Sequence, residues 1–265
     1  MNCAKCKSQS CQIKSKQNWP NNCPMWDEGL ISRGLALYKE GGNEEMYANG
    51  MKGMRHVMGR MSRVMEAVSF CKANGYKKIG VAYCSGMLPY GRMVVDIFEE
   101  YGFEVVSAGC KTAGLGAGDF IDLEKYGIKR ADPPAPQVDA ARANAPKKEF
   151  KPLFPEDGKI PEWPTFDPKN VKDRPRPPMN RASCNPLGQA EAINSENTEF
   201  NIVVGLCVGH DTLFLKQSEA PCTVVVVKDR LYHDICKPAV EAAYEYCVND
   251  VNKDFYVSVE EEAED

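Results

Sequence analysis

The chain has 265 residues, of which 43% are hydrophobic and 26% are charged, the composition of a globular protein with a sizeable core. Its formal net charge of -4, from 33 basic and 37 acidic residues, argues against a general affinity for nucleic acids. No apolar run approaches the roughly 20 residues that cross a bilayer, and the chain starts with a polar segment rather than a signal sequence. We therefore expect a cytoplasmic protein with neither a nucleic-acid nor a membrane partner.

Twelve cysteines are spread along the chain. Because cytoplasmic thiols stay mostly reduced, such cysteines serve as metal ligands, reactive thiols or small core residues. Four of them, Cys3, Cys6, Cys11 and Cys23, fall within residues 1–26. Two cysteines on one tight turn can reach the same metal, and two further thiols complete a tetrahedron. This segment has little apolar sequence, so zinc or a 4Fe–4S cluster would supply its folding energy; a disordered tail is the alternative.

The first predicted helix covers residues 44–74. Its methionines recur at alternating steps of three and four residues, which places them on one face. Core packing explains this face better than a soft-metal site, because methionine fills irregular apolar gaps. Asn74 and Gly75 are typical of the end of a helix.

Alternating strands and helices follow. Strands are predicted at 78–84, 103–108, 201–207 and 222–228, and helices at 89–101, 187–195, 211–217 and 238–249. This alternation indicates βαβ units and a parallel sheet. The predicted fold class is therefore α/β, a Rossmann-like and mostly parallel sheet preceded by the short cysteine-rich metal module. Residues 27–129 and 179–250 would together form the α/β domain.

Residues 130–178 contain twelve of the eighteen prolines. Prolines at this density preclude a regular helix or a central strand. Aromatic residues among them, such as Trp163, argue against a fully disordered linker. We interpret the segment as an extended arm that lies over the domain or over a second copy of the chain, which would form a homodimer. Residues 251–265 are predicted to form an acidic, solvated tail.

Cysteines follow two of the predicted strands in the same pattern. Cys84 and Cys207 each end an apolar strand, and each is followed by a glycine two residues on and then by a helix. Ligands bind at the carboxyl edge of a parallel sheet, where the positive end of a helix dipole favours a thiolate. Cys110, after the second strand, and Cys184, before a helix, are expected at the same edge. These four thiols form the candidate cofactor-binding site, with ordinary packing of small residues as the alternative.

His210 lies three residues after Cys207, at the start of a predicted helix. A helix amino end favours the neutral imidazole, which can accept a proton or bind a metal. Cys207 as nucleophile and His210 as base are therefore candidate catalytic residues. Alternatively, His210 and Asp211 only cap the helix. Residues 228–230 (KDR), where the fourth predicted strand ends, would bind an anion at this edge or form surface ion pairs.

These motifs resemble those of the domain-of-unknown-function family 1847, described as metal-binding proteins of bacteria and archaea. The resemblance is carried by the four amino-terminal cysteines and by residues 77–84 (KKIGVAYC), 184–190 (CNPLGQA), 205–211 (GLCVGHD) and 227–230 (VKDR). It implies a metal-binding amino terminus without an established reaction. Family members have a second cysteine shortly after the position of Cys110, where this sequence has Thr112 and Ala113. The resemblance therefore implies a site with fewer thiol ligands, and the proline-rich segment is a further departure.

Taken together, these features predict a metal-binding protein in which cysteines hold an iron–sulfur cluster (4Fe–4S) or zinc. Its role would be electron transfer or redox chemistry at the sheet edge, which requires a redox partner protein. Two alternatives stand beside this prediction. One is a thiolate-dependent enzyme that uses Cys207 or Cys84 with His210, and the other is a zinc-binding carrier or sensor.

Overall fold

A computed structural model describes residues 3–13, 16, 18–57, 61–128, 182–228, 241 and 244, with residues 13 and 53–57 described by their backbone alone. The chain divides into two compact units, residues 1–52 and residues 53–265. The proline-rich arm and the acidic tail lie outside the described residues, as does most of the last predicted helix. In the described ranges, no helix combines the length and the apolar character needed to cross a membrane.

The first unit contains short 3-10 helices followed by α-helix. Its elements are η1 (Cys3–Lys5), η2 (Ser10–Ile13), η3 (Pro24–Trp26), α1 (Glu28–Leu37) and the beginning of α2 (Asn43–Val57). The Asp27 carboxylate starts α1 by accepting a hydrogen bond from the Leu30 amide at 3.2 Å. Trp19 and Trp26 pack edge-to-face with ring centres 5.1 Å apart. Every residue of α1 is at least partly exposed, so these contacts are mostly local.

The single helix predicted over residues 44–74 is wrong. The chain instead forms α2 and, in the second unit, α3 (Arg63–Ala73). Ser62 separates them with an extended backbone (φ -73°, ψ 159°), the conformation of a residue that precedes a new helix. The methionines expected on one helix face are therefore divided between two helices, with Met51 in α2 and Met65 in α3.

The two ends of that methionine face have different surroundings. Met65 of α3 is buried in the core, whereas Met51 of α2 is 49% exposed. The predicted end of the helix is confirmed, because Gly75 adopts a positive φ of 71° and its amide donates to the Lys72 carbonyl at 2.9 Å. Among the described side chains of the segment, those of α3 therefore supply the buried apolar face that the pattern predicted.

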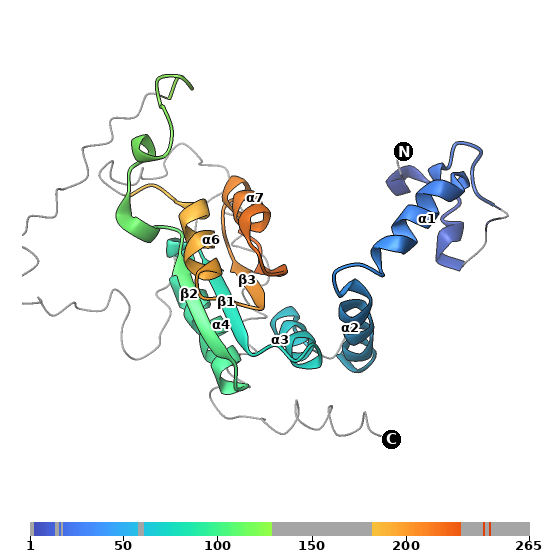
Figure 1. The fold of residues 1–265 in the computed structure, drawn as a ribbon, viewed down its shortest axis with the longest axis horizontal. Helices are drawn as coiled ribbons and strands as arrows, with labels where there is room; N and C mark the ends of the chain where they lie inside the picture. Colours follow the sequence, from blue (N-terminus) through green and yellow to red (C-terminus); the bar gives the residue numbers. More distant parts are fainter. Residues whose placement is uncertain are drawn as a thin grey trace, which may run out of the picture. The chain divides into compact units, whose positions relative to one another are not determined.

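The second unit is built on a four-stranded sheet. Its strands are β1 (Lys78–Tyr83), β2 (Glu104–Gly109), β3 (Phe200–Val204) and β4 (Cys222–Val226). They pair in the order β2-β1-β3-β4, and every pairing is parallel. The connecting helices are η4 (Ser85–Met87), α4 (Leu88–Glu100), η5 (Thr112–Gly114), η6 (Ala117–Asp119), α6 (Pro186–Asn194) and α7 (Val208–Gln217). The predicted α/β fold is confirmed (Figure 1).

Helices cover both faces of this sheet. Successive side chains of a strand point to opposite faces. Gly80 of β1 faces Ile193 of α6, since a Cβ at Gly80 would lie 2.6 Å from the Ile193 Cγ2. Tyr83, three residues further along β1, contacts Gly91 of α4. Helices α6 and α4 therefore lie on opposite faces of the sheet, and β1 is buried between them, which explains its almost continuous apolar sequence.

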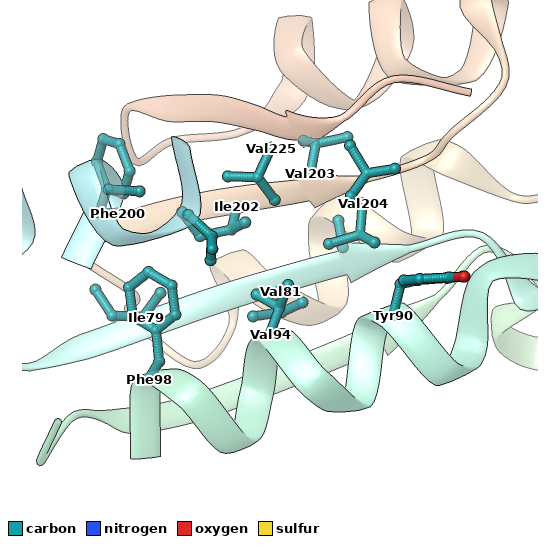
Figure 2. Packing of buried hydrophobic residues seen from close by; sticks show 14 of the residues in the cluster. Ile79, Val81, Tyr90, Val94, Phe98, Phe200, Ile202, Val203, Val204 and Val225 are labelled. Carbon is teal, nitrogen blue, oxygen red and sulfur yellow. The ribbon is translucent and has the colours of Figure 1, made fainter. Parts of the chain in front are cut away.

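The core on the α4 side is packed from residues four apart on that helix. Figure 2 shows Tyr90, Val94 and Phe98 directed from α4 toward the strands. Val94 and Phe98 are completely buried, as is Ile202 of β3. Burying each such side chain contributes about 1.5–3 kcal/mol to folding. Phe70 of α3 reaches Phe200 with ring centres 5.3 Å apart and closes the amino end of the core.

The third strand ends earlier than predicted. β3 stops at Val204, and Gly205 turns the chain with a φ of 62°, which glycine adopts without strain. Helix α7 correspondingly begins at Val208 rather than at residue 211. Cys207 thus stands between the strand and the helix, three residues beyond β3.

Candidate thiol site at the carboxyl edge of the sheet

The strand order creates a switch point between β1 and β3. From β1 the chain passes to β2 on one side, and it then crosses to β3 on the other side of β1. The carboxyl ends of two such strands are where open α/β sheets bind ligands. Cys84 directly follows β1, and Cys207 is the residue that precedes α7. Both cysteines therefore lie at the switch point.

Backbone hydrogen bonds bring Cys110 and Cys184 to the same edge. The Cys110 amide donates to the Tyr83 carbonyl at 2.9 Å, which extends the ladder between β1 and β2. The Asn185 amide donates in turn to the Cys110 carbonyl at 2.8 Å. This bond joins two distant parts of the chain and sets Cys184 beside Cys110.

The sulfur of Cys110 is the centre of the cluster. It lies 3.7 Å from the Cys184 sulfur, and a hydrogen bond links it to the Cys84 thiol. The Ser85 amide donates to it at 3.3 Å, and the Ser85 hydroxyl is equally close. Cys110 is 2% exposed, whereas Cys184 is half-buried. Three thiols from separate segments are thus joined through one sulfur.

Positive charge surrounds these thiols. Lys228, two residues after β4, places its ammonium nitrogen 2.6 Å from the Cys84 sulfur. The charge of Lys111 acts on Cys184. Helix α6 begins two residues after Cys184, so the positive end of its dipole adds to this field. The edge therefore favours negatively charged sulfur.

The thiols differ in acidity. The hydrogen bond with Cys110 and the charge of Lys111 lower the pKa of Cys184 to about 6, against the opposing effect of its partial burial. The pKa of Cys84 is instead raised, because its hydrogen bond with Cys110 and its burial outweigh the neighbouring Lys228. Of Cys84 and Cys184, therefore, Cys184 has the lower pKa, although the closest ammonium lies beside Cys84.

We expect this difference to be visible in alkylation rates. In reduced, metal-free protein, Cys184 should react with iodoacetamide at half its limiting rate near pH 6, because only the thiolate is nucleophilic. Cys222, whose pKa burial raises, should react only at alkaline pH and serves as the internal control. Pulsed alkylation at a series of pH values, followed by mass spectrometry of each cysteine, measures how the alkylation rates of Cys184 and Cys222 depend on pH. A midpoint for Cys184 equal to that of Cys222 would contradict the expectation.

The profile of a family described as protein of unknown function (DUF1847) matches residues 23–144 and 169–225, well over half of the chain. The chain belongs to this family. It is also similar to the uncharacterized protein MJ0455 of Methanocaldococcus jannaschii, with 32% identity over 185 residues, which is 70% of this chain and 69% of that protein. No solved structure matches the chain.

The extent of the DUF1847 match separates the two groups of cysteines. The four cysteines of the edge all lie within it. The match begins at Cys23, so Cys3, Cys6 and Cys11 precede it, and it omits residues 145–168 of the proline-rich arm. The family membership expected from the motifs is confirmed. Its description assigns no ligand and no reaction, so metal binding stays a prediction.

The amino-terminal cysteines lie on short turns. The Cys6 amide donates to the Cys3 carbonyl at 3.1 Å, which forms the tight turn expected of this pair. Cys11 lies in η2, and Cys23 precedes η3. Cys3 and Cys11 are exposed, and Cys6 and Cys23 are half-buried. A metal held jointly by these four thiols remains a prediction.

Two sulfurs of the edge have the spacing of metal ligands. Sulfurs bound to one tetrahedral zinc at about 2.3 Å lie roughly 3.8 Å apart, close to the 3.7 Å between Cys110 and Cys184. In the described part of the chain, no three or more Cys, His, Asp or Glu side chains gather as they would around a single ion. The thiol ligands and the distance between the Cys110 and Cys184 sulfurs therefore fit a metal site. The described residues do not bring together a complete set of ligands for one ion.

Cys207 and His210 both belong to the first turn of α7. The His210 amide donates to the Cys207 carbonyl at 2.7 Å, and both residues are half-buried. Cys207 interacts electrostatically with Cys184, so it lies near the cluster at the edge. The helix therefore holds the predicted nucleophile and base near each other, while their catalytic roles stay a prediction.

Some residues of the site had little signal in the sequence. Gln189 is completely buried, and its amide nitrogen donates to the Tyr83 carbonyl at 3.1 Å and to the Ala108 carbonyl at 2.6 Å. It thereby ties the ends of β1 and β2 just before Cys84 and Cys110. Nothing in the local sequence distinguishes it from a surface glutamine of a helix. The position of Lys228 at the end of a predicted strand indicated that it lies at the sheet edge. No sequence pattern indicated that it contacts Cys84.

Proposed function

We propose that the chain binds a metal centre, an iron–sulfur cluster (4Fe–4S) or zinc, through Cys84, Cys110, Cys184 and Cys207. The observation that carries the proposal is the 3.7 Å separation of the Cys110 and Cys184 sulfurs, with the Cys84 thiol hydrogen-bonded to the first of them. Cysteine sulfur is the ligand that both centres prefer. The position at a switch point of a parallel sheet supports a ligand site rather than core packing.

The electrostatics of the edge support the same proposal. A metal ligand must be a thiolate, and the pKa of Cys184 lies well below the ordinary range for a thiol. Four thiolates leave either centre with a net negative charge, which the ammonium of Lys228 beside Cys84 would offset. The half-buried position of Cys184 would leave one side of the centre close to the surface.

The two centres place different demands on the spacing of the thiols. The Cys110 and Cys184 sulfurs, 3.7 Å apart, stand as two ligands of one zinc ion do. Each cysteine of a 4Fe–4S cluster binds a different iron, so these two sulfurs would have to move apart to hold a cluster. The cluster is supported instead by the arrangement of the described thiols, which lie along one edge without three of them gathering around a single ion. When bound, such a cluster supplies one-electron chemistry, and a redox partner protein would approach the edge. The amino-terminal Cys3, Cys6, Cys11 and Cys23 are proposed as a second, separate metal site.

The experiment is metal analysis of protein purified without oxygen. We expect a brown protein that contains iron and acid-labile sulfide. The double substitution Cys110→Ser, Cys184→Ser should remove the metal of the edge, and Cys3→Ser, Cys6→Ser should remove only that of the amino terminus. Cys222→Ser is the matched control, because this half-buried cysteine begins β4 at the opposite edge. Unchanged metal content in the Cys110, Cys184 variant would refute the edge site.

Other outcomes of the same analysis select the other candidates. A colourless protein with bound zinc supports a zinc carrier or sensor. A second candidate, a thiolate-dependent enzyme, is favoured by the low pKa of Cys184 and by Cys207 and His210 in one helical turn. The raised pKa of Cys84 makes it the poorer nucleophile. Protein that holds no metal at either group of cysteines would favour the enzyme.

A further inference from the structure

We propose that Cys110 and Cys184 form a reversible disulfide by exchange with a low-molecular-weight disulfide. Their sulfurs are in contact at 3.7 Å. A disulfide bond is about 2.05 Å long, so the sulfurs must approach each other by roughly 1.7 Å, which side-chain rotation can supply. None of the described cysteines is bridged in this structure. The inference concerns the protein without metal and stands apart from the proposed function.

The backbone segments that carry the two cysteines are joined by a hydrogen bond. The Asn185 amide donates to the Cys110 carbonyl at 2.8 Å, so the two segments run side by side. Segments joined in this way lie about 5 Å apart, and bridged cysteines usually have Cα atoms about 4.4–6.8 Å apart. The bridge therefore needs no rearrangement of the sheet.

The surroundings distinguish this pair from Cys84 and Cys110. Cys84 is 7% exposed and its sulfur contacts the Lys228 ammonium at 2.6 Å, so a dissolved disulfide has little access to it. Cys184 is half-buried and can be reached from solvent. Cys110 is 2% exposed and is held by the Ser85 amide next to Cys184. An accessible attacking thiol beside a buried second thiol is the arrangement that exchange requires.

The exchange has two steps. The Cys184 thiolate attacks one sulfur of glutathione disulfide, the glutathione S–S bond breaks, and one glutathione leaves as a thiolate and takes up the proton that Cys184 lost. The Cys110 thiol then loses its proton and attacks the Cys184 sulfur. A Cys110–Cys184 bond forms, and the second glutathione leaves and is protonated. The protein dithiol is thereby oxidised by two electrons, and the reagent is reduced to two thiols.

This disulfide would give the edge two states. In the dithiol state both sulfurs are available as ligands, whereas in the disulfide state neither can bind a metal as a thiolate. Oxidation would therefore release a metal from the edge, a consequence that rests on the proposed function. The disulfide itself would form whether or not the chain ever binds a metal there.

The test uses full-length protein that has been reduced and freed of metal with a chelator. After incubation with glutathione disulfide, remaining thiols are alkylated, and the joined peptides are mapped by mass spectrometry. We expect Cys110 and Cys184 to lose their reactivity together, a peptide that joins them to appear, and a thiol reductant to reverse both changes. Cys222→Ser should behave as the parent. The metal content of reduced protein, measured separately, decides the proposed function independently.

Single substitutions test the order of the steps. Cys110→Ser should accumulate one glutathione on Cys184, because the second thiol is missing. Cys184→Ser should leave Cys110 unmodified, because Cys110 is buried. The proposal is overturned if the parent protein keeps both thiols after oxidation, or if Cys110 is joined mainly to Cys84. Both results come from the parent chain, so they do not depend on the folding of a variant.

Discussion

Replacing Gly80 by alanine is expected to lower the free energy of unfolding by about 3 kcal/mol, since overpacking and disrupted buried hydrogen bonds add. Gly80 lies in the middle of β1, where a Cβ would stand 2.6 Å from the Ile193 Cγ2 and still closer to the Asn201 side chain. Asn201 cannot move aside without cost. It is completely buried, accepts a hydrogen bond from Thr198 and donates one to Ser218, each at 2.8 Å.

The matched control is Gly209→Ala in the first turn of α7. No atom outside the local helix lies within 4 Å of a Cβ at this position, so we expect no loss and a gain of up to about 1 kcal/mol from helix propensity. Urea unfolding of both variants and the parent, followed by circular dichroism, measures the difference. Equal midpoints for Gly80→Ala and the parent would show that β1 and α6 are not packed as closely as described.

Replacing Gln189 by leucine is expected to lower the free energy of unfolding by about 2–3 kcal/mol, because two carbonyls at the ends of β1 and β2 lose a buried donor. These carbonyls belong to Tyr83 and Ala108. The Tyr83 carbonyl keeps its bond from the Cys110 amide, which limits the loss. Cys84 follows Tyr83 directly and Cys110 lies two residues after Ala108, so the variant should also loosen the thiol cluster. We expect Cys110 to be alkylated faster than in the parent.

Gln217→Leu separates this effect from the general effect of removing a helical glutamine. Gln217 is exposed at the end of α7, and its substitution should change stability by less than about 0.5 kcal/mol. The two variants are compared by urea unfolding and by the alkylation rate of Cys110. A Gln189 variant as stable as the Gln217 variant, with Cys110 equally protected, would mean that Gln189 does not tie the strand ends together.

The elements of the α/β unit were largely predictable because their signals are local. β1 and β4 carry runs of apolar residues, and α6 is preceded by Asn185, whose side chain caps the helix by accepting a hydrogen bond from the Gly188 amide. The break before α3, where Ser62 is extended, was missed because the methionine spacing continues through it. The end of β3 was missed for a similar reason, because Gly205 turns the chain inside an apolar run.

The sequence by itself determined that Cys84 and Cys110 follow strands, that Cys184 and Cys207 precede helices, and that such positions meet at the carboxyl edge of a parallel sheet. These are consequences of backbone conformation over a few residues. Only the tertiary structure decided that Cys110 contacts Cys184 at 3.7 Å and that Lys228 approaches Cys84 rather than solvent. Those distances depend on the strand order β2-β1-β3-β4 and on the register of each pair. Order and register are set by long-range packing of the buried faces, which no local pattern specifies.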